Sequence, residues 1–126
     1  MSDCRIVRGG HGLRGKQGLD YLIGVSAEST GAQGICMQLL ELPPGAAATP
    51  HYHEGHETAI YIVEGAAEMR HGPNLELVDR VEAGDFVYIP AGAPHQPYNP
   101  TDRPMRAVIA RTDPSEQESV VLLDPQ

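Results

Sequence analysis

The chain has 126 residues and contains no tryptophan, one phenylalanine, one lysine and only two cysteines. Cys4 and Cys36 are too few for a disulfide framework, and their spacing is not that of a zinc-binding or redox pair. Neither an apolar signal region nor a run of about 18 apolar residues occurs. These absences predict a protein that does not cross a membrane and that lies in the cytoplasm with reduced cysteines.

Positive charge is also scarce. Lys and Arg total 9 against 17 Asp and Glu, which gives a formal net charge of −8 at pH 7. Nucleic acids and anionic membrane surfaces attract basic proteins. The composition therefore disfavours both as partners, and we expect a small-molecule ligand or substrate instead.

No segment keeps a helical period of 3.6 residues for three turns, so any helix is expected to be short. The chain instead contains short apolar runs separated by turns rich in Gly and Pro. They cover residues 19–26, 35–42, 58–63, 66–70, 75–81, 86–89, 105–111 and 119–123. Strands at such spacing are typical of an all-β sandwich or barrel made of two packed antiparallel sheets. The run 35–42 is apolar on both parities, which predicts packing on both faces.

Residues 1–18 are polar and rich in glycine, and we predict that they form a flexible N-terminal arm, leaving residues 19–126 as a single domain. Residues 10–15 match the GxGxxG spelling of dinucleotide-binding loops. No strand before them and no helix after them is predicted, so the match does not indicate a nucleotide site.

Two further segments are predicted not to form central strands. Five prolines between residues 90 and 104 indicate an extended, turn-rich stretch that cannot be a central strand. The acidic segment 113–118 is predicted to be a solvated connection.

Histidine is abundant, with six residues, and three of them, His51, His53 and His56, lie within six positions. Residues i and i+2 of a strand share a face about 6.6 Å apart. Two imidazoles at that distance can lean onto one ion at about 2.1 Å each. Because imidazole binds many metals, the spacing does not identify the ion.

A second motif brings in a fourth histidine. Residues 84–99 read Gly, five residues, Pro-x-Gly, two residues, His, three residues, Asn, with His95 at the histidine position. Gly84 and Asp85 suit a turn, a short strand follows, and Pro90 and Gly92 suit the next turn. We expect His95 to begin a strand and to point into the interior.

These two motifs resemble those of the cupin superfamily, and in particular small single-domain bacterial cupins. The matching residues are Gly45, His51, His53 and Gly65 in the first motif, and Gly84, Pro90, Gly92, His95 and Asn99 in the second. The resemblance implies a double-stranded β-helix, or jelly-roll barrel. It also implies one divalent transition metal per chain, Fe, Mn, Zn or Ni, bound by His51, His53 and His95. A homodimer is expected on the same basis.

The sequence departs from the cupin pattern at the glutamate ligand. Counted back from Gly65, that position is occupied by Thr58, and Glu57 lies one residue out of register. A shift of one residue moves a side chain to the opposite face of a strand. By this count His56 shares the inward face with Thr58 and would be the fourth ligand. A bulge near Gly55 would instead restore Glu57, and both alternatives stay open.

Three further side chains are candidates for contacts around the metal: Gln38, Gln96 and Thr58. A metal with open coordination positions would suit an enzyme acting on a small oxygen-rich molecule, by dioxygenase, isomerase or cyclase chemistry. No residue pattern identifies catalytic groups beyond the metal ligands. The alternatives are a non-catalytic cupin that binds or senses a small molecule, and a purely structural metal.

Overall fold

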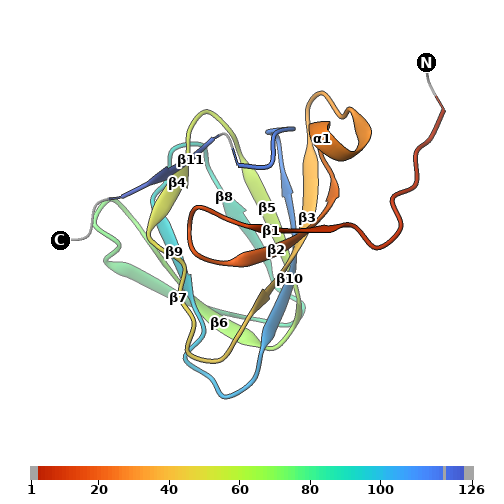
Figure 1. Ribbon diagram of the computed structural model, residues 1–126. Coiled ribbons are helices and arrows are strands. Elements are labelled where there is room, and N and C mark those ends of the chain that lie inside the picture. Colours follow the sequence, from red (N-terminus) through yellow and green to blue (C-terminus); the bar gives the residue numbers. More distant parts are fainter. Residues whose placement is uncertain (1–2, 118, 124–126) are drawn as a thin grey trace.

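The computed structural model describes residues 3–117 and 119–123, which form two antiparallel sheets and one short helix (Figure 1). The larger sheet has the strand order β1-β2-β3-β10-β5-β8, and the smaller sheet has the order β11-β4-β9-β6-β7. The elements are β1 His11–Arg14, β2 Asp20–Val25, α1 Ala27–Thr30, β3 Cys36–Leu42, β4 His51–His53, β5 Thr58–Glu64, β6 Ala66–His71, β7 Leu77–Glu82, β8 Phe86–Ile89, β9 His95–Tyr98, β10 Met105–Arg111 and β11 Val120–Leu122. The all-β fold predicted from the sequence is confirmed.

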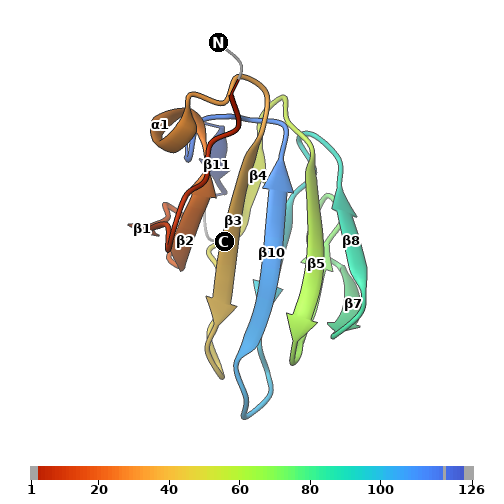
Figure 2. The ribbon, with the colours of Figure 1, turned by 90° about the vertical axis from the view of Figure 1, so that its right-hand side faces the viewer.

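Figure 2 looks onto the outer face of the larger sheet, where β2, β3, β10, β5 and β8 lie side by side. Side chains of β3 alternate strictly, with Gln38, Leu40 and Leu42 buried and Met37 and Leu39 exposed. The inward residues of this sheet and of the loops pack into one apolar core. That core contains Leu19, Tyr21, Ile23, Leu40, Leu42, Ala48, Ile62, Ala67, Met105, Ala107 and Ile109.

The prediction that residues 35–42 pack on both faces is wrong within the single chain. Met37 and Leu39 on the outer face of β3 are 46% and 47% exposed, respectively. Nothing in the described part of the chain covers this face. The apolar side chains on the outer face of β3 are therefore exposed to solvent in the single chain.

The smaller sheet overturns the expectation for the proline-rich stretch. Strand β9 contains Pro97 and lies between β4 and β6, in the interior of the sheet. Pro97 has no N–H to donate, but its carbonyl accepts a hydrogen bond from Ala48 N at 3.0 Å. Pairing between β4 and β9 is limited to His51 opposite His95. Because few ladder bonds are required there, a proline is tolerated in a central strand.

The two sheets are not joined by a hydrogen-bonded pair of strands among the described residues. Strand β7 is an edge strand of the smaller sheet, and β8 is an edge strand of the larger sheet. Because these two strands do not pair, the predicted barrel is open here and forms a sandwich of two sheets. The turn between these strands contains Gly84, whose φ of 97° is available to glycine at little cost. The opening matters for the site described below.

Part of the predicted N-terminal arm is a strand. Residues 11–14 form β1 and pair with β2 in antiparallel register, while residues 3–10 are exposed and extend away from the sheets (Figure 1). Gly15, which follows β1, has no room for a side chain, because an added Cβ would lie 2.6 Å from the Tyr21 ring. The glycines around β1 thus permit close packing, and no helix follows β1 to complete a nucleotide-binding motif.

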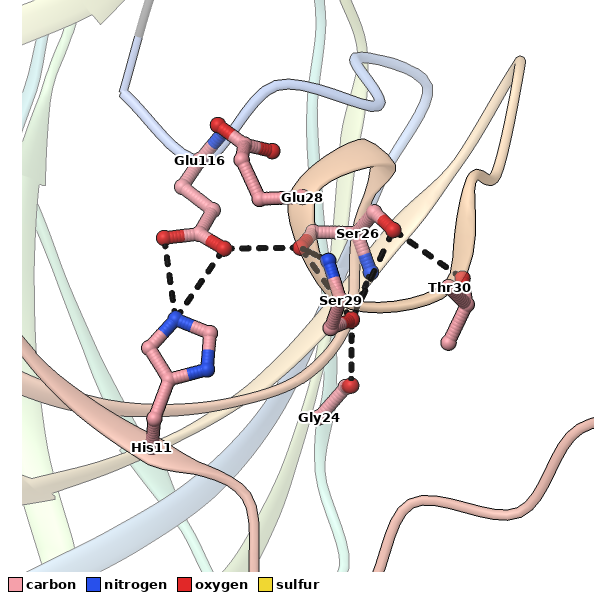
Figure 3. A network of polar contacts seen from close by, with 7 residues as sticks. All are labelled: His11, Gly24, Ser26, Glu28, Ser29, Thr30 and Glu116. Carbon is pink, nitrogen blue, oxygen red and sulfur yellow. Dashed lines mark hydrogen bonds and ion pairs between the residues drawn. The ribbon is translucent and has the colours of Figure 1, made fainter.

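A polar network fastens β1 and α1 to the C-terminal segment (Figure 3). The Glu116 carboxylate lies 3.1 Å from His11 Nε2 and accepts a hydrogen bond of 2.7 Å from Ser26 Oγ. Ser26 also caps α1 by accepting from Ser29 N. Glu116 and Asp113 are buried, so the prediction of a solvated connection is wrong for these residues, whereas Glu118 lies outside the described residues.

The described part of the chain contains one helix, α1, which has four residues. It is far too short and polar to cross a bilayer.

Candidate metal centre

Three histidines from two neighbouring strands meet inside the sandwich. His51 and His53 lie on β4 and His95 begins β9, and the three are 3%, 2% and 4% exposed. Their donor atoms all lie within 4.8 Å of one another. Nitrogens that bind one tetrahedral ion at about 2.1 Å are about 3.4 Å apart, so small adjustments would bring this group onto a metal.

Backbone carbonyls orient two of the three rings. Nδ1 of His51 lies 2.7 Å from Thr49 O, and Nδ1 of His95 lies 2.9 Å from Ala93 O. A carbonyl only accepts, so each Nδ1 carries the proton and donates it. In the neutral ring this leaves Nε2 with a free lone pair, which is the arrangement of a metal-binding histidine.

The same environment keeps the rings neutral. Burial, followed by the charge of His95, lowers the pKa of His51 to about 3. Burial also lowers the pKa of His53, with further lowering by Arg111 and the neighbouring histidines. The pKa of His95 is lowered mainly by burial. Protons therefore do not compete for these lone pairs near neutral pH, and the group is ready to accept a cation.

The two candidates for a fourth ligand lie outside this group. His56 is half-buried in the turn that precedes β5, and Glu57 is exposed. The Glu57 carboxylate accepts a hydrogen bond of 2.7 Å from Tyr88 OH. Gly55 has a φ of 75° in a turn, and β5 begins at Thr58, which is 2% exposed. The count back from Gly65 thus correctly places the Thr58 side chain on the inward face of the strand.

The two glutamines differ in their position. Gln38 is buried on the inward face of β3, and neither its amide nitrogen nor its amide oxygen has a hydrogen-bond partner in the described chain. Gln96 directly follows His95 in β9, so the two side chains project to opposite faces of the sheet. Its Nε2 donates to Ala48 O at 3.0 Å. The amide of Gln38 could therefore bind a ligand inside the sandwich, whereas the amide of Gln96 is hydrogen-bonded to a backbone carbonyl.

One buried residue was not expected from the sequence: Arg111, at the end of β10. It is 4% exposed, and its Nε donates to Thr58 Oγ1 at 3.3 Å. Its charge contributes to lowering the pKa values of all three histidines. The sequence does contain a signal for its burial, because Arg111 continues the alternating inward series of Met105, Ala107 and Ile109.

A cavity of about 730 Å³ lies at the edge where the sheets separate. Its lining includes His95 together with Met69, Val81, Phe86, Ile89 and Pro94. Ligand sites in proteins are typically concave, mostly apolar and of this size. The cavity therefore connects the surface between β7 and β8 to one member of the histidine group.

The family model for the cupin domain matches residues 38–111, more than half of the chain. The protein belongs to the cupin family. The matched residues include both histidine motifs and the strands that carry them, which confirms the resemblance seen in the sequence.

Among curated proteins, the chain is similar to the tetracenomycin polyketide synthase protein TcmJ of Streptomyces glaucescens. The two are 31% identical over 85 residues, which cover 68% of this chain and 55% of TcmJ. The chain thus spans about half the length of this relative.

Solved structures support the fold. The polyketide cyclase RemF of Streptomyces resistomycificus superposes with a TM-score of 0.72 at 22% identity, over 100% of this chain and 87% of RemF. An oxalate decarboxylase variant from B. subtilis gives a TM-score of 0.79 at 21% identity, over 98% of this chain and 33% of that chain. A Klebsiella pneumoniae protein described by its double-stranded β-helix domain gives 0.69 at 17% identity, over 96% and 90%.

Proposed function

We propose that this cupin is a metal-dependent enzyme that acts on a small oxygen-rich molecule. One divalent transition metal would be bound by Nε2 of His51 and His95 and by His53. The observation that carries the proposal is the buried group of three histidines whose donor atoms lie within 4.8 Å of one another. The cupin fold, in which this group lies on two neighbouring strands, also supports the proposal.

The donor set fits such an ion. Three neutral imidazoles suit Fe, Mn, Zn and Ni alike, so the identity of the metal is left to measurement. Nδ1 of His53 is buried and has no hydrogen-bond partner in the described chain. A bound metal or ligand would supply the partner that this nitrogen lacks. When bound, the metal would supply Lewis acidity toward a carbonyl or enolate oxygen. Three protein ligands leave at least one coordination position for that oxygen.

Similar proteins support the substrate class. TcmJ is a polyketide synthase protein, RemF is a polyketide cyclase, and other similar structures are oxalate decarboxylases, one of them studied for its Mn(II) centres. Polyketides and oxalate, the compounds that these names mention, are oxygen-rich molecules. The apolar lining of the cavity beside His95 would suit the carbon skeleton of such a molecule.

A homodimer is part of the proposal. The outer face of the larger sheet exposes large apolar side chains on four strands: Leu22, Met37, Leu39, Tyr61, Val63, Phe86 and Tyr88. Monomeric proteins rarely leave a continuous apolar patch of this kind in water. A second copy packed on this face would also explain why the outward side chains of β3 are apolar.

We further propose a cytoplasmic location, which is supported by the two free cysteines.

The proposal is tested by elemental analysis of the purified protein, followed by turnover of a cyclic enol and a β-diketone with added Fe(II) or Mn(II). We expect about one metal ion per chain and turnover that a chelator abolishes. Bound metal with ligand binding but without turnover of any such compound would support a non-catalytic binding cupin instead. Metal content near zero after incubation with each ion would contradict the whole proposal.

A further inference from the structure

The interior of the sandwich contains a cation that no described acid neutralises by direct contact. The Arg111 side chain is 4% exposed, and its Nη1 has no hydrogen-bond partner in the described chain. No ion pair within 4.0 Å joins Arg111 to a carboxylate among residues 3–117 and 119–123. A buried charge without a partner costs several kcal/mol, so an arginine in this position points to a counter-ion.

Thr58 and Arg111 are cross-strand neighbours on the inward face of the larger sheet. The Thr58 hydroxyl accepts from Nε and so fixes one edge of the guanidinium. The free nitrogen Nη1 is left to contact something else. A planar guanidinium held in this way is well suited to bind the oxygens of a carboxylate or an enolate.

Arg111 faces the histidine group. Arg111 projects inward from β10 of one sheet, and the three histidines are buried on β4 and β9 of the other. The positive charge of Arg111 contributes to the lowering of the pKa values of all three histidines. Because the two sheets face each other, Arg111 and the three histidines lie on opposite sides of the interior.

The nearby groups do not supply the missing negative charge in full. Burial raises the pKa values of the Tyr21 hydroxyl and the Cys36 thiol, so both stay neutral. Glu116 is occupied by His11 and Ser26 (Figure 3). Asp113 is buried and can offset one positive charge from a distance. If Asp113 offsets the charge of Arg111, the two positive charges of a divalent metal bound by neutral imidazoles still lack a counter-ion.

We propose that Arg111, oriented by Thr58, binds an oxygen of an anionic carboxylate or enolate ligand beside the histidine metal site. The inference rests on the proposed function and deepens it, because it names the charge of the substrate. Arg111 would thus be a substrate-binding residue that favours anionic over neutral oxygen-rich molecules. The unpartnered amide of Gln38 lies on the same inward face, where it is available to the rest of the ligand.

The test compares acetate with its neutral isostere acetamide. Wild-type protein, R111Q and R111K are loaded with Mn(II), and paramagnetic broadening of the ligand methyl proton signal gives the affinity. The wild type is expected to bind acetate at least 10-fold more tightly than acetamide, whereas R111Q keeps its metal and loses this preference. R111K keeps the charge without the planar fork and is expected to bind acetate several-fold more weakly than the wild type. The matched control is R106Q, because Arg106 lies on the same strand but is exposed and pairs with Glu41.

A folded, metal-loaded R111Q that retains the acetate preference would overturn the inference. So would equal acetate binding by R111K and wild type if R111Q does not fold, as judged by circular dichroism. If the wild type binds no metal, the proposed function fails, and the inference is tested separately on metal-free protein. Acetate should then raise the melting temperature of wild type and R106Q more than that of R111K, and an equal rise in R111K would contradict the role of Arg111.

Discussion

His51 and His95 are direct cross-strand partners in the smaller sheet, and their ring centroids lie 4.3 Å apart. They come from different motifs and lie 44 positions apart in the sequence. The carbonyl of His53 accepts a hydrogen bond of 2.9 Å from Gly92 N, which ties the turn before His95 to β4. The site is thus built on paired backbone, where ring positions are well determined.

This geometry predicts that the three histidines bind metal as a unit. Substitution of His51, His53 or His95 by alanine removes one of three donors, and we expect metal affinity to fall by at least 100-fold in each variant. Inductively coupled plasma mass spectrometry after gel filtration measures the loss. His11→Ala is the matched control, because His11 lies on β1 of the other sheet and pairs with Glu116. Full metal content in any of the three variants would show that the ion is not shared.

The fourth ligand is tested by a second pair of variants. Glu57 points outward to Tyr88, so Glu57→Gln should leave metal affinity unchanged. His56 is half-buried, and its charge is among those that lower the pKa of His53. We therefore expect His56→Ala to weaken metal binding several-fold, measured by competition with a chromogenic chelator. A loss confined to Glu57→Gln would instead support a rearranged turn at Gly55.

Much of this site follows from the sequence, and the reason is local. Strands β8 and β10 have the predicted bounds, because each apolar run lies between turns that Gly and Pro enforce. The i, i+2 spacing places His51 and His53 on one face of a strand, and the resemblance of the two motifs to those of cupins adds His95 to the group.

What the sequence could not predict depends on distant partners. Strand β1 is rich in glycine and polar, and its pairing is secured by Glu116 at the other end of the chain. Pro97 sits in a central strand because its position requires no donor in the sparse β4–β9 ladder. The parity of Arg111 with Met105, Ala107 and Ile109 indicates an inward position, but its hydrogen bond to Thr58 depends on a partner 53 residues away in the sequence.

The depressed pKa values predict how the metal-free protein responds to acid. An unfolded histidine has a pKa of about 6.5, whereas buried His51 remains neutral until about pH 3. Between these values the unfolded chain binds more protons, so the free energy of unfolding falls as the pH is lowered. Urea unfolding of chelator-treated protein at pH 7.0 and pH 5.5, a range above most carboxyl titrations, measures this slope.

The control for the acid response is a variant with His51, His53 and His95 all changed to glutamine. This variant keeps His11, His56 and His71, so it retains any contribution from the other histidines. Its stability should fall less than that of the wild type between the two pH values. Equal slopes in the two proteins would contradict the assignment of the acid response to the histidine group.

Asn99 is expected to contribute to stability and not to binding. It is fully buried, and its Nδ2 donates to Leu42 O and Arg103 O at 2.9 and 2.7 Å. Its Oδ1 accepts from Thr101 N. Asn99→Ala leaves buried carbonyls unpaired, and we expect a loss of about 2–4 kcal/mol in urea unfolding, with metal content unchanged. Exposed Asn74→Ala should change stability by less than about 0.5 kcal/mol, and a similar small effect at Asn99 would refute the structural role.

The apolar outer face of the larger sheet predicts the oligomeric state. Phe86 is 82% exposed and packs against Tyr61 with ring centroids 4.7 Å apart, so the two form one apolar cluster on this face. Burial of this face between two copies would remove the cluster from water, and a charge placed within it would remain unpaired in the interface. We expect wild-type protein to sediment as a dimer at micromolar concentration and Phe86→Asp to sediment as a monomer with an unchanged circular dichroism spectrum. Val78→Asp is the matched control, since Val78 is 54% exposed on β7 of the smaller sheet and should leave the dimer intact. A monomeric wild type, or a Phe86→Asp variant that still dimerises, would rule out this face as the interface.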